Sequence, residues 1–317
     1  MVKRRRKVDS QVVNTIKPGN VTSFDEALKA FIQSSELRGL SDATVTFYRR
    51  ELDLYRRKMV ELDALDIVRV HKIKPQDIEL FISAEMDVGK SRNTINSRLR
   101  AVRAFYSFCY RKQWLKRNPF DEVKLLKTRH TVGDTFSPSQ LKRILDAPDI
   151  TTFTGLRDYS IMLMFAHTGI RLNELSSLRT HDIDFEDGAI NIQHAKNTHA
   201  RRIPMTKRLH ATMSAWVTER GQIPGVNALF ITYEDKPLSR RQIQQRVAYY
   251  GKRTGLSDDV ATSPHTFRRT FAKNKIASGT DVFTVQALMG HSDLSVLKKY
   301  VAIYSQDLKN AIENGIE

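Results

Sequence analysis

The apolar pattern of this chain changes at about residue 124, and this change limits the possible folds more than any other feature. Before that point, four successive segments have the cap residues or the apolar spacing of helices. Residues 124–136 have no helical stripe, and we interpret them as an interdomain linker. Since 317 residues are enough to bury a core in each of two ordinary domains, we expect one domain on either side of this segment.

The N-terminal half is predicted to be a helical domain at residues 22–123. Ser23, Ser41 and Ser91 each stand just before a helix-forming stretch, and each predicts an N-cap. A further helix is predicted at residues 75–87. The helix after Ser91 has the clearest apolar stripe, which comprises Ile95, Leu99, Val102, Tyr106 and Cys109.

The positive charge of the chain is large and uneven. The formal net charge is +17, and residues 1–130 hold 28 Lys and Arg against 16 Asp and Glu. A polyanion such as nucleic acid is therefore the indicated partner, although a merely soluble basic protein would show the same total. Residues 1–21 are predicted to be a basic tail, which is either simply solvated or touches phosphates non-specifically.

Basic side chains recur along two of the predicted helices. Positions seven apart are nearly two helical turns apart, so the clusters that follow Tyr48 and Tyr55 share a side of the second helix. A solvated basic face is the alternative to DNA contact. We predict contacts to the DNA backbone from Arg49, Arg50, Arg56, Arg57 and Lys58 on the second helix, and from Arg92, Arg100 and Arg103 on the fourth.

The composition also indicates the compartment. The single Cys109 excludes an internal disulfide and any cysteine metal cluster, which fits a reducing cytoplasm. No apolar run approaches the roughly 18–20 residues that span a bilayer, and the N-terminus lacks the apolar core of a signal peptide. We expect a cytoplasmic, nucleoid-associated protein with no membrane partner.

The C-terminal half contains arginines whose sequence surroundings indicate that they bind an anion. Arg171 ends an otherwise apolar helical run, and its forked guanidinium group fits two phosphate oxygens. Glu174, three residues on, is placed to orient Arg171, and a purely structural Arg171–Glu174 pair is the alternative. His265 and Arg268 are expected on one face of the first turn of a helix that Ser263 caps.

Two further segments complete the pattern. Residues 189–192 alternate like a strand and residues 201–204 return, which predicts a β-hairpin with Lys196 in its turn. Towards the C-terminus, His291 follows Gly290 at an expected turn, and Tyr300 stands nine residues later.

Arg, then His-x-x-Arg, then Gly-His, then Tyr, in this order, resembles the catalytic half of the tyrosine recombinases (phage integrase family). The resemblance implies a mainly α (α+β) chain. Its N-terminal part would be a helical core-binding (SAM-like) domain, and residues 137–317 would form a mixed α/β catalytic domain with a small β-sheet.

The same resemblance implies a catalytic role for each residue of this pattern. Arg171 and Arg268 would clamp the scissile phosphate, and His265 would accept a proton or donate a hydrogen bond to the phosphate. Lys196 stands eight residues before a Pro, as in the family, and would protonate the leaving 5′-oxygen. His291 would help to position the nucleophile. Tyr300 would attack the phosphate, whereas Tyr304 is a rival by geometry alone.

The resemblance implies a site-specific DNA recombinase, or integrase, that works through a 3′-phosphotyrosyl intermediate without a cofactor, metal ion or ATP. Its partners would be double-stranded DNA and three further copies of the chain, and accessory DNA-bending factors cannot be read from the sequence. The C-terminal helix predicted at residues 305–312 would pack on a neighbouring protomer or on its own domain. The alternatives are a repressor-like DNA-binding regulator on an integrase scaffold and a relaxing enzyme of the type IB topoisomerase kind.

Overall fold

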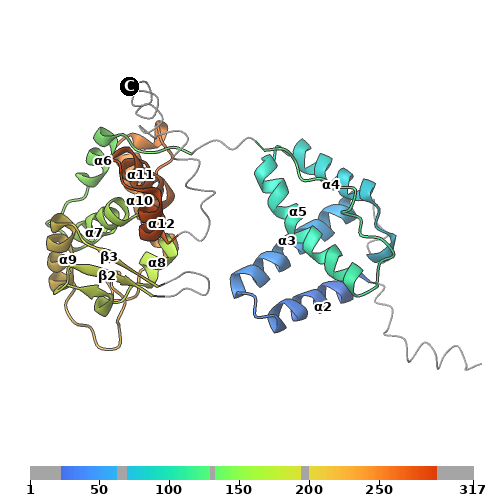
Figure 1. The fold of residues 1–317 in the computed structure, drawn as a ribbon, viewed down its shortest axis with the longest axis horizontal. Helices are drawn as coiled ribbons and strands as arrows, with labels where there is room; N and C mark the ends of the chain where they lie inside the picture. The colour runs from blue at the N-terminus through green and yellow to red at the C-terminus, as the bar shows by residue number, and fades with distance from the viewer. Residues whose placement is uncertain (1–22, 63–69, 129–132, 194–199, 291–317) are drawn as a thin grey trace, which may run out of the picture. The chain divides into compact units, whose positions relative to one another are not determined.

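The chain forms two compact units, Met1–His130 and Thr131–Glu317 (Figure 1). Each unit has its own apolar core. The structure is a computed structural model, and it describes residues 23–62, 70–128, 133–193 and 200–290. None of the helices in these ranges is both long and apolar enough to cross a membrane.

In the first unit, the described elements are all helical. They are α2 (Phe24–Leu37), α3 (Asp42–Glu61), the short 3-10 helix η1 (Val70–Lys72), α4 (Pro75–Asp87) and α5 (Arg92–Arg111). Ser23, Ser41 and Ser91 cap α2, α3 and α5, and each side-chain oxygen accepts a hydrogen bond from the backbone N–H three residues on. The predicted helices and their caps are therefore confirmed.

The core of the first unit lies around α5. The predicted stripe of this helix is buried, because Ile95, Leu99, Val102 and Cys109 are 0% exposed and Tyr106 is 1% exposed. The helix packs against α2, α3 and α4, so that four helices close over one apolar centre. Rings from separate helices meet there, and Tyr55 of α3 crosses Tyr106 edge-on at 6.2 Å.

The second unit combines helices with one small sheet. Its elements are α6 (Pro138–Leu145), α7 (Phe153–Thr168), α8 (Leu172–Ser177), η2 (Thr180–Asp182), β1 (Ile183–Asp184), β2 (Ala189–Ile192), β3 (Arg201–Pro204), α9 (Lys207–Arg220), α10 (Arg240–Arg253), η3 (Leu256–Asp258), α11 (Pro264–Ala277) and α12 (Val282–Met289). The strands are antiparallel in the order β1-β2-β3. The predicted hairpin strands and the mainly helical fold class are confirmed.

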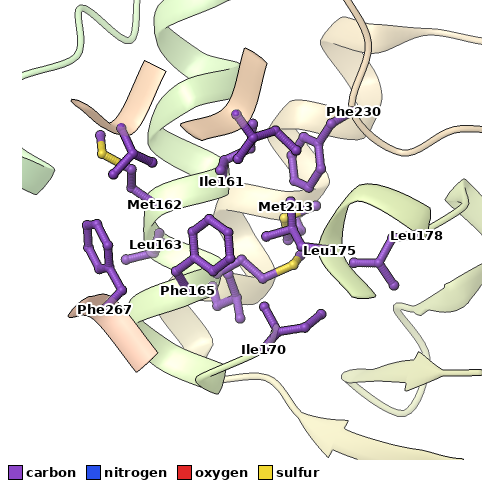
Figure 2. Packing of buried hydrophobic residues seen from close by; sticks show 14 of the residues in the cluster. Ile161, Met162, Leu163, Phe165, Ile170, Leu175, Leu178, Met213, Phe230 and Phe267 are labelled. Atoms are coloured by element: carbon purple, nitrogen blue, oxygen red, sulfur yellow. The ribbon is translucent and has the colours of Figure 1, made fainter. Parts of the chain in front are cut away.

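Helix α7 is the centre of the second unit. Five successive residues, Ile161 to Phe165, are at most 2% exposed, and a helix that is apolar on every side is stable only when it is covered on every side. Accordingly, α7 packs against α6, α9, α10 and α11. Figure 2 shows the side chains of α7 among those of the neighbouring elements, with Phe267 on one side and Phe230 and Met213 on another.

The segment predicted as a linker contributes to both cores. Leu125 and Leu126 pack against the first core, whereas Phe136 is buried in the second. Ser137 caps α6, and its side chain and that of Gln140 exchange hydrogen bonds with each other's backbone N–H groups. The division of the chain into tail, domains and linker stays a prediction.

Candidate active site

Arg171 owes its position to a sharp turn between α7 and α8. Helix α7 ends at Thr168, and Gly169 follows with a left-handed φ of 60°. A Cβ atom at Gly169 would lie 2.5 Å from the ring of Phe271, so any side chain there would displace that ring. The chain therefore turns at Gly169 and places Arg171 as the N-cap residue of α8.

Glu174 holds Arg171 within this turn. The backbone N–H of Arg171 donates to Oε2 of Glu174 at 2.8 Å, and its Nη1 donates to Oε1 at 2.9 Å. Arg201, which comes from β3, donates to the same two oxygens, with Nη1 at 3.0 Å from Oε1 and Nη2 at 2.8 Å from Oε2. Two guanidinium groups thus share one carboxylate, and this leaves a net positive charge at the site.

The carboxyl group of Glu174 is ionised at neutral pH. Its side chain is 3% exposed, and this burial raises its pKa. Hydrogen bonds from Arg201 and Arg171, together with the charge of Arg201, lower the pKa by more, and the result is a pKa of about 2. The pair that the sequence suggested as Arg171–Glu174 is in fact a network of three residues.

Arg268 reaches the same place from α11. Ser263 caps this helix, with Pro264 at its first position, as the sequence predicted. Arg268 lies one turn further on and is 5% exposed. Its Nη1 donates to the carbonyl oxygen of Gly169, and its Nη2 donates to that of Met289 at 2.8 Å.

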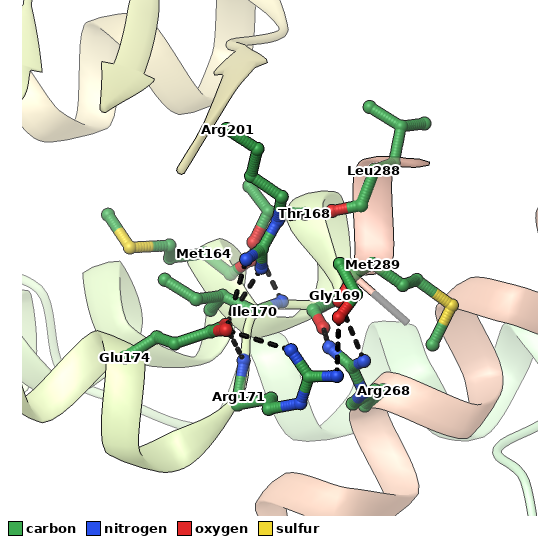
Figure 3. A network of polar contacts seen from close by, with 11 residues as sticks. Met164, Thr168, Gly169, Ile170, Arg171, Glu174, Arg201, Arg268, Leu288 and Met289 are labelled. Atoms are coloured by element: carbon green, nitrogen blue, oxygen red, sulfur yellow. Dashed lines mark hydrogen bonds and ion pairs between the residues drawn. The ribbon is translucent and has the colours of Figure 1, made fainter. Parts of the chain in front are cut away.

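The three arginines meet at the C-terminal end of α12 (Figure 3). The carbonyl oxygen of Leu288 accepts from Arg201 at 2.9 Å, and that of Gly290 accepts from Arg171 at 2.7 Å. The intervening carbonyl oxygen, that of Met289, accepts from Arg268. The last carbonyls of a helix lack partners within it, so they attract cations. Arg171 and Arg268, which are far apart in the sequence, therefore converge.

Two of the three arginines also line a cleft of about 470 Å³. Its lining residues include Arg171, Arg268, His265 and Gln244. His265 is exposed in this cleft. The pKa of His265 is lowered, first by partial loss of hydration and then by the charges of Arg269 and Arg268. A neutral imidazole can accept a proton. His265 lines the same cleft as Arg171 and Arg268, whose positive charges suit an anion.

Four of the predicted site residues thus lie together, namely Arg171, Glu174, His265 and Arg268. Lys196, His291 and Tyr300 lie outside the described residues, as do Tyr304, the basic tail and the predicted C-terminal helix. The sequence analysis missed Arg201. The signal was present, because Arg201 stands two residues before the buried Ile203 on a strand and therefore shares its face.

The predicted DNA-binding residues of the second helix are all engaged with acidic groups. The pairs are Arg49–Glu36 at 3.1 Å, Arg50–Glu51 at 2.6 Å, Arg56–Asp25 at 3.0 Å, Arg57–Asp53 at 3.0 Å and Lys58–Glu61 at 3.2 Å. Most of these cations are largely exposed, and exposed ion pairs contribute little to stability. In the Arg49–Glu36 and Arg57–Asp53 pairs both partners are more than half exposed, so loss of these two pairs would cost little stability.

The basic residues of α5 differ from one another. Arg100 is exposed, whereas Arg92 donates to the carbonyl oxygen of Lys127 at 3.2 Å and Arg103 donates to that of Val123 at 3.1 Å. The guanidinium group of Arg103 also lies 5.4 Å from the ring centre of Phe120. Arg92 and Arg103 thus hold the segment after α5 against the first unit, a role that the sequence analysis did not anticipate.

Comparison with known families agrees with this geometry. The profile of the phage integrase family matches residues 134–307, and that of the phage integrase N-terminal SAM-like domain matches residues 22–113. The chain belongs to the phage integrase family. The resemblance drawn from the order of Arg, His-x-x-Arg, Gly-His and Tyr is confirmed.

Relatives of this phage integrase family member include tyrosine recombinases. It is 29% identical over 270 residues to the tyrosine recombinase XerC of Thermodesulfovibrio yellowstonii, covering 83% of this chain and 87% of that protein. It is 27% identical over 292 residues to the tyrosine recombinase XerD of Staphylococcus haemolyticus, covering 91% and 96% respectively.

Solved structures share the fold. An integrase of the transposon Tn1549, in complex with circular intermediate DNA, superposes with a TM-score of 0.76 at 19% identity and covers 93% of this chain and 100% of its own. A lambda integrase dimer bound to a core site gives a TM-score of 0.71 at 16% identity and covers 93% and 81% respectively.

Proposed function

We propose that this chain is a site-specific DNA recombinase that cleaves and rejoins DNA through a covalent bond to Tyr300. The observation that carries the proposal is the meeting of Arg171 and Arg268 in one cleft with His265. Two guanidinium groups that line one cleft suit a phosphate that gains negative charge during the reaction. The names of the curated relatives, tyrosine recombinases XerC and XerD, support the same function.

The proposed chemistry is a direct displacement at phosphorus. The phenolic oxygen of Tyr300 forms a bond to the phosphorus atom while the bond to the 5′-oxygen breaks, which gives a 3′-phosphotyrosyl link and a free 5′-hydroxyl. His265 takes the phenolic proton and Lys196 supplies a proton to the leaving oxygen. His291 helps to orient the phosphate. The phosphotyrosyl bond retains the energy of the broken linkage, so rejoining requires neither ATP nor a metal ion.

We further propose that four copies act on two DNA duplexes, which are bound by the basic residues of the first unit and by the cleft of the second. In the first unit, Arg49, Arg50, Arg56, Arg57 and Lys58 would exchange their carboxylate partners for phosphates. On α5, Arg100 is exposed and would meet a phosphate directly, whereas Arg92 and Arg103 would first have to release the carbonyl oxygens of Lys127 and Val123. The net charge of +17 supports a polyanionic partner.

Covalent capture tests the proposal. Duplex sites would be selected from random DNA by the purified chain, and a selected duplex would then be nicked next to the cleaved phosphate, so that the released end diffuses away. Wild type and Tyr304→Phe should form a protein–DNA adduct, whereas Tyr300→Phe should form none. Arg171→Ala and Arg268→Ala should bind the duplex but lose cleavage.

Each of the other outcomes identifies a different function. Sequence-specific binding by wild type without any adduct would overturn the recombinase and favour a regulator. An adduct that relaxes supercoiled DNA but never exchanges strands between two sites would favour a relaxing enzyme. If Tyr300→Phe still formed the adduct and Tyr304→Phe did not, the nucleophile would be Tyr304 and not Tyr300.

A further inference from the structure

Arg201 is a buried cation that the proposed cleavage chemistry does not use. Its side chain is 9% exposed. Its Nη1 and Nη2 atoms donate to the two oxygens of Glu174, and its Nε donates to the carbonyl oxygen of Leu288 (Figure 3). A fork that meets both carboxylate oxygens has a well-defined geometry, because rotation of either group breaks one of the two bonds.

The contacts of Arg201 join elements that carry the phosphate clamp. Arg201 comes from β3, Glu174 lies in α8 next to Arg171, and Leu288 is in the last turn of α12. Arg171 itself bonds to Glu174 and to the carbonyl oxygen of Gly290. A shift of either the carboxylate or the end of α12 would therefore turn the guanidinium group of Arg171 away from its present direction.

The backbone leaves room for this arrangement. Gly290 has a φ of 62°, and a Cβ atom there would lie 2.6 Å from Nη1 of Arg201. A residue with a side chain at position 290 would thus push Arg201 out of its place. Arg201 is not among the residues that line the cleft, and its hydrogen bonds go to Glu174 and to the carbonyl oxygen of Leu288 instead.

We propose that Arg201 is a positioning residue, which locks Glu174 to the end of α12 so that Arg171 and Arg268 face the same phosphate. The inference rests on the proposed cleavage reaction, and its effect would appear in the rate of cleavage rather than in DNA affinity. Misplacing a reacting group by about 1 Å costs on the order of a hundredfold in rate. Loss of Arg201 should have an effect of that size.

The chain offers a matched control on the same strand. Arg202 is 48% exposed and pairs with Asp184 and Asp187 at the surface. Arg202→Ala removes the same charge from β3 but leaves the Glu174 network intact. We expect it to form the covalent adduct at the wild-type rate.

The main experiment measures adduct formation in a single turnover on the nicked duplex. Arg201→Ala should slow the reaction by about a hundredfold, with DNA affinity changed less than about threefold. Arg201→Lys keeps the charge but not the fork, so it should be slower than wild type by about tenfold. Because Arg201 acts through Glu174, the double variant Arg201→Ala/Glu174→Gln should be no slower than the slower single variant.

A second readout does not require activity. Backbone amide hydrogen exchange in residues 282–290 should be faster in Arg201→Ala than in Arg202→Ala, because the end of α12 loses a cap. If Arg201→Ala does not fold, Arg201→Lys takes its place in both measurements.

The outcomes separate the two proposals. If the wild-type protein forms no adduct through Tyr300, the proposed recombinase function is overturned. Amide hydrogen exchange in α12 would still test whether Arg201 holds the end of that helix in place. Cleavage by Arg201→Ala at the rate of Arg202→Ala, or unchanged exchange in α12, overturns the role of Arg201.

Discussion

The buried carboxylate of Glu174 should make the second unit sensitive to acid. Glu174→Gln keeps the size of the side chain but removes the charge that two arginines share. Each pKa unit corresponds to about 1.4 kcal/mol, so a fall from the usual 4.5 to about 2 stabilises the folded state by about 3 kcal/mol at pH 7. We expect Glu174→Gln to lower the free energy of unfolding by about this amount.

The sign of the pH dependence follows from the direction of the shift. The folded-state pKa of Glu174 lies below the unfolded one, so the stabilisation is present above pH 4.5 and is lost as the pH falls towards 2. At pH 3 the difference between wild type and Glu174→Gln should shrink to about 1–1.5 kcal/mol.

The assay is urea unfolding followed by tryptophan fluorescence. The chain has two tryptophans, and Trp114→Phe leaves only Trp216, which is buried in the second unit. Glu186→Gln is the control, since Glu186 is exposed and its loss should change the free energy by less than about 0.5 kcal/mol. Equal stability of the two glutamine variants at pH 7, or a gap that widens as the pH falls, would refute the reasoning.

Three further predictions concern the scaffold and the DNA interface. Ser263→Ala removes the oxygen that accepts from the N–H of Thr266, and it should lower the free energy of unfolding by about 1 kcal/mol in the same fluorescence assay. Gly169→Ala combines a left-handed backbone with a clash against Phe271, and its cost should exceed about 1 kcal/mol, measured by thermal unfolding. Arg56→Gln should reduce the slope of log affinity against log salt by about 1 in a DNA-binding titration, and an unchanged slope would remove α3 from the interface.

Much of the local structure could be predicted because its causes lie within a few residues. The caps at Ser23, Ser137 and Ser263 involve groups three positions apart. The stripe of α5 follows from helical periodicity alone, and burial of every member confirms it. Residues 189–192 were visible as a strand by their alternation, and residues 201–204 as the segment that returns beside it.

The candidate site was predictable only in part. The order of the motifs identified Arg171, His265 and Arg268 by resemblance, but their roles still await experiment. Arg201 was missed because alternation along β3 shows which face a residue occupies and not what it meets there. Its partner Glu174 is 27 positions away in the sequence.

By itself, the sequence determined the four helices of the first unit, the hairpin strands, the excess of positive charge and the family. The tertiary structure alone decided which side chains share one carboxylate and which carbonyls they cap. The physical reason is range, because caps and periodicity act between neighbours in the chain. Arg171 and Gly290 are 119 positions apart, and they meet only because α7, α8 and α11 pack around one core while α12 packs against α11 and β3. A long, forked side chain takes its partner from whatever the folded core brings within reach.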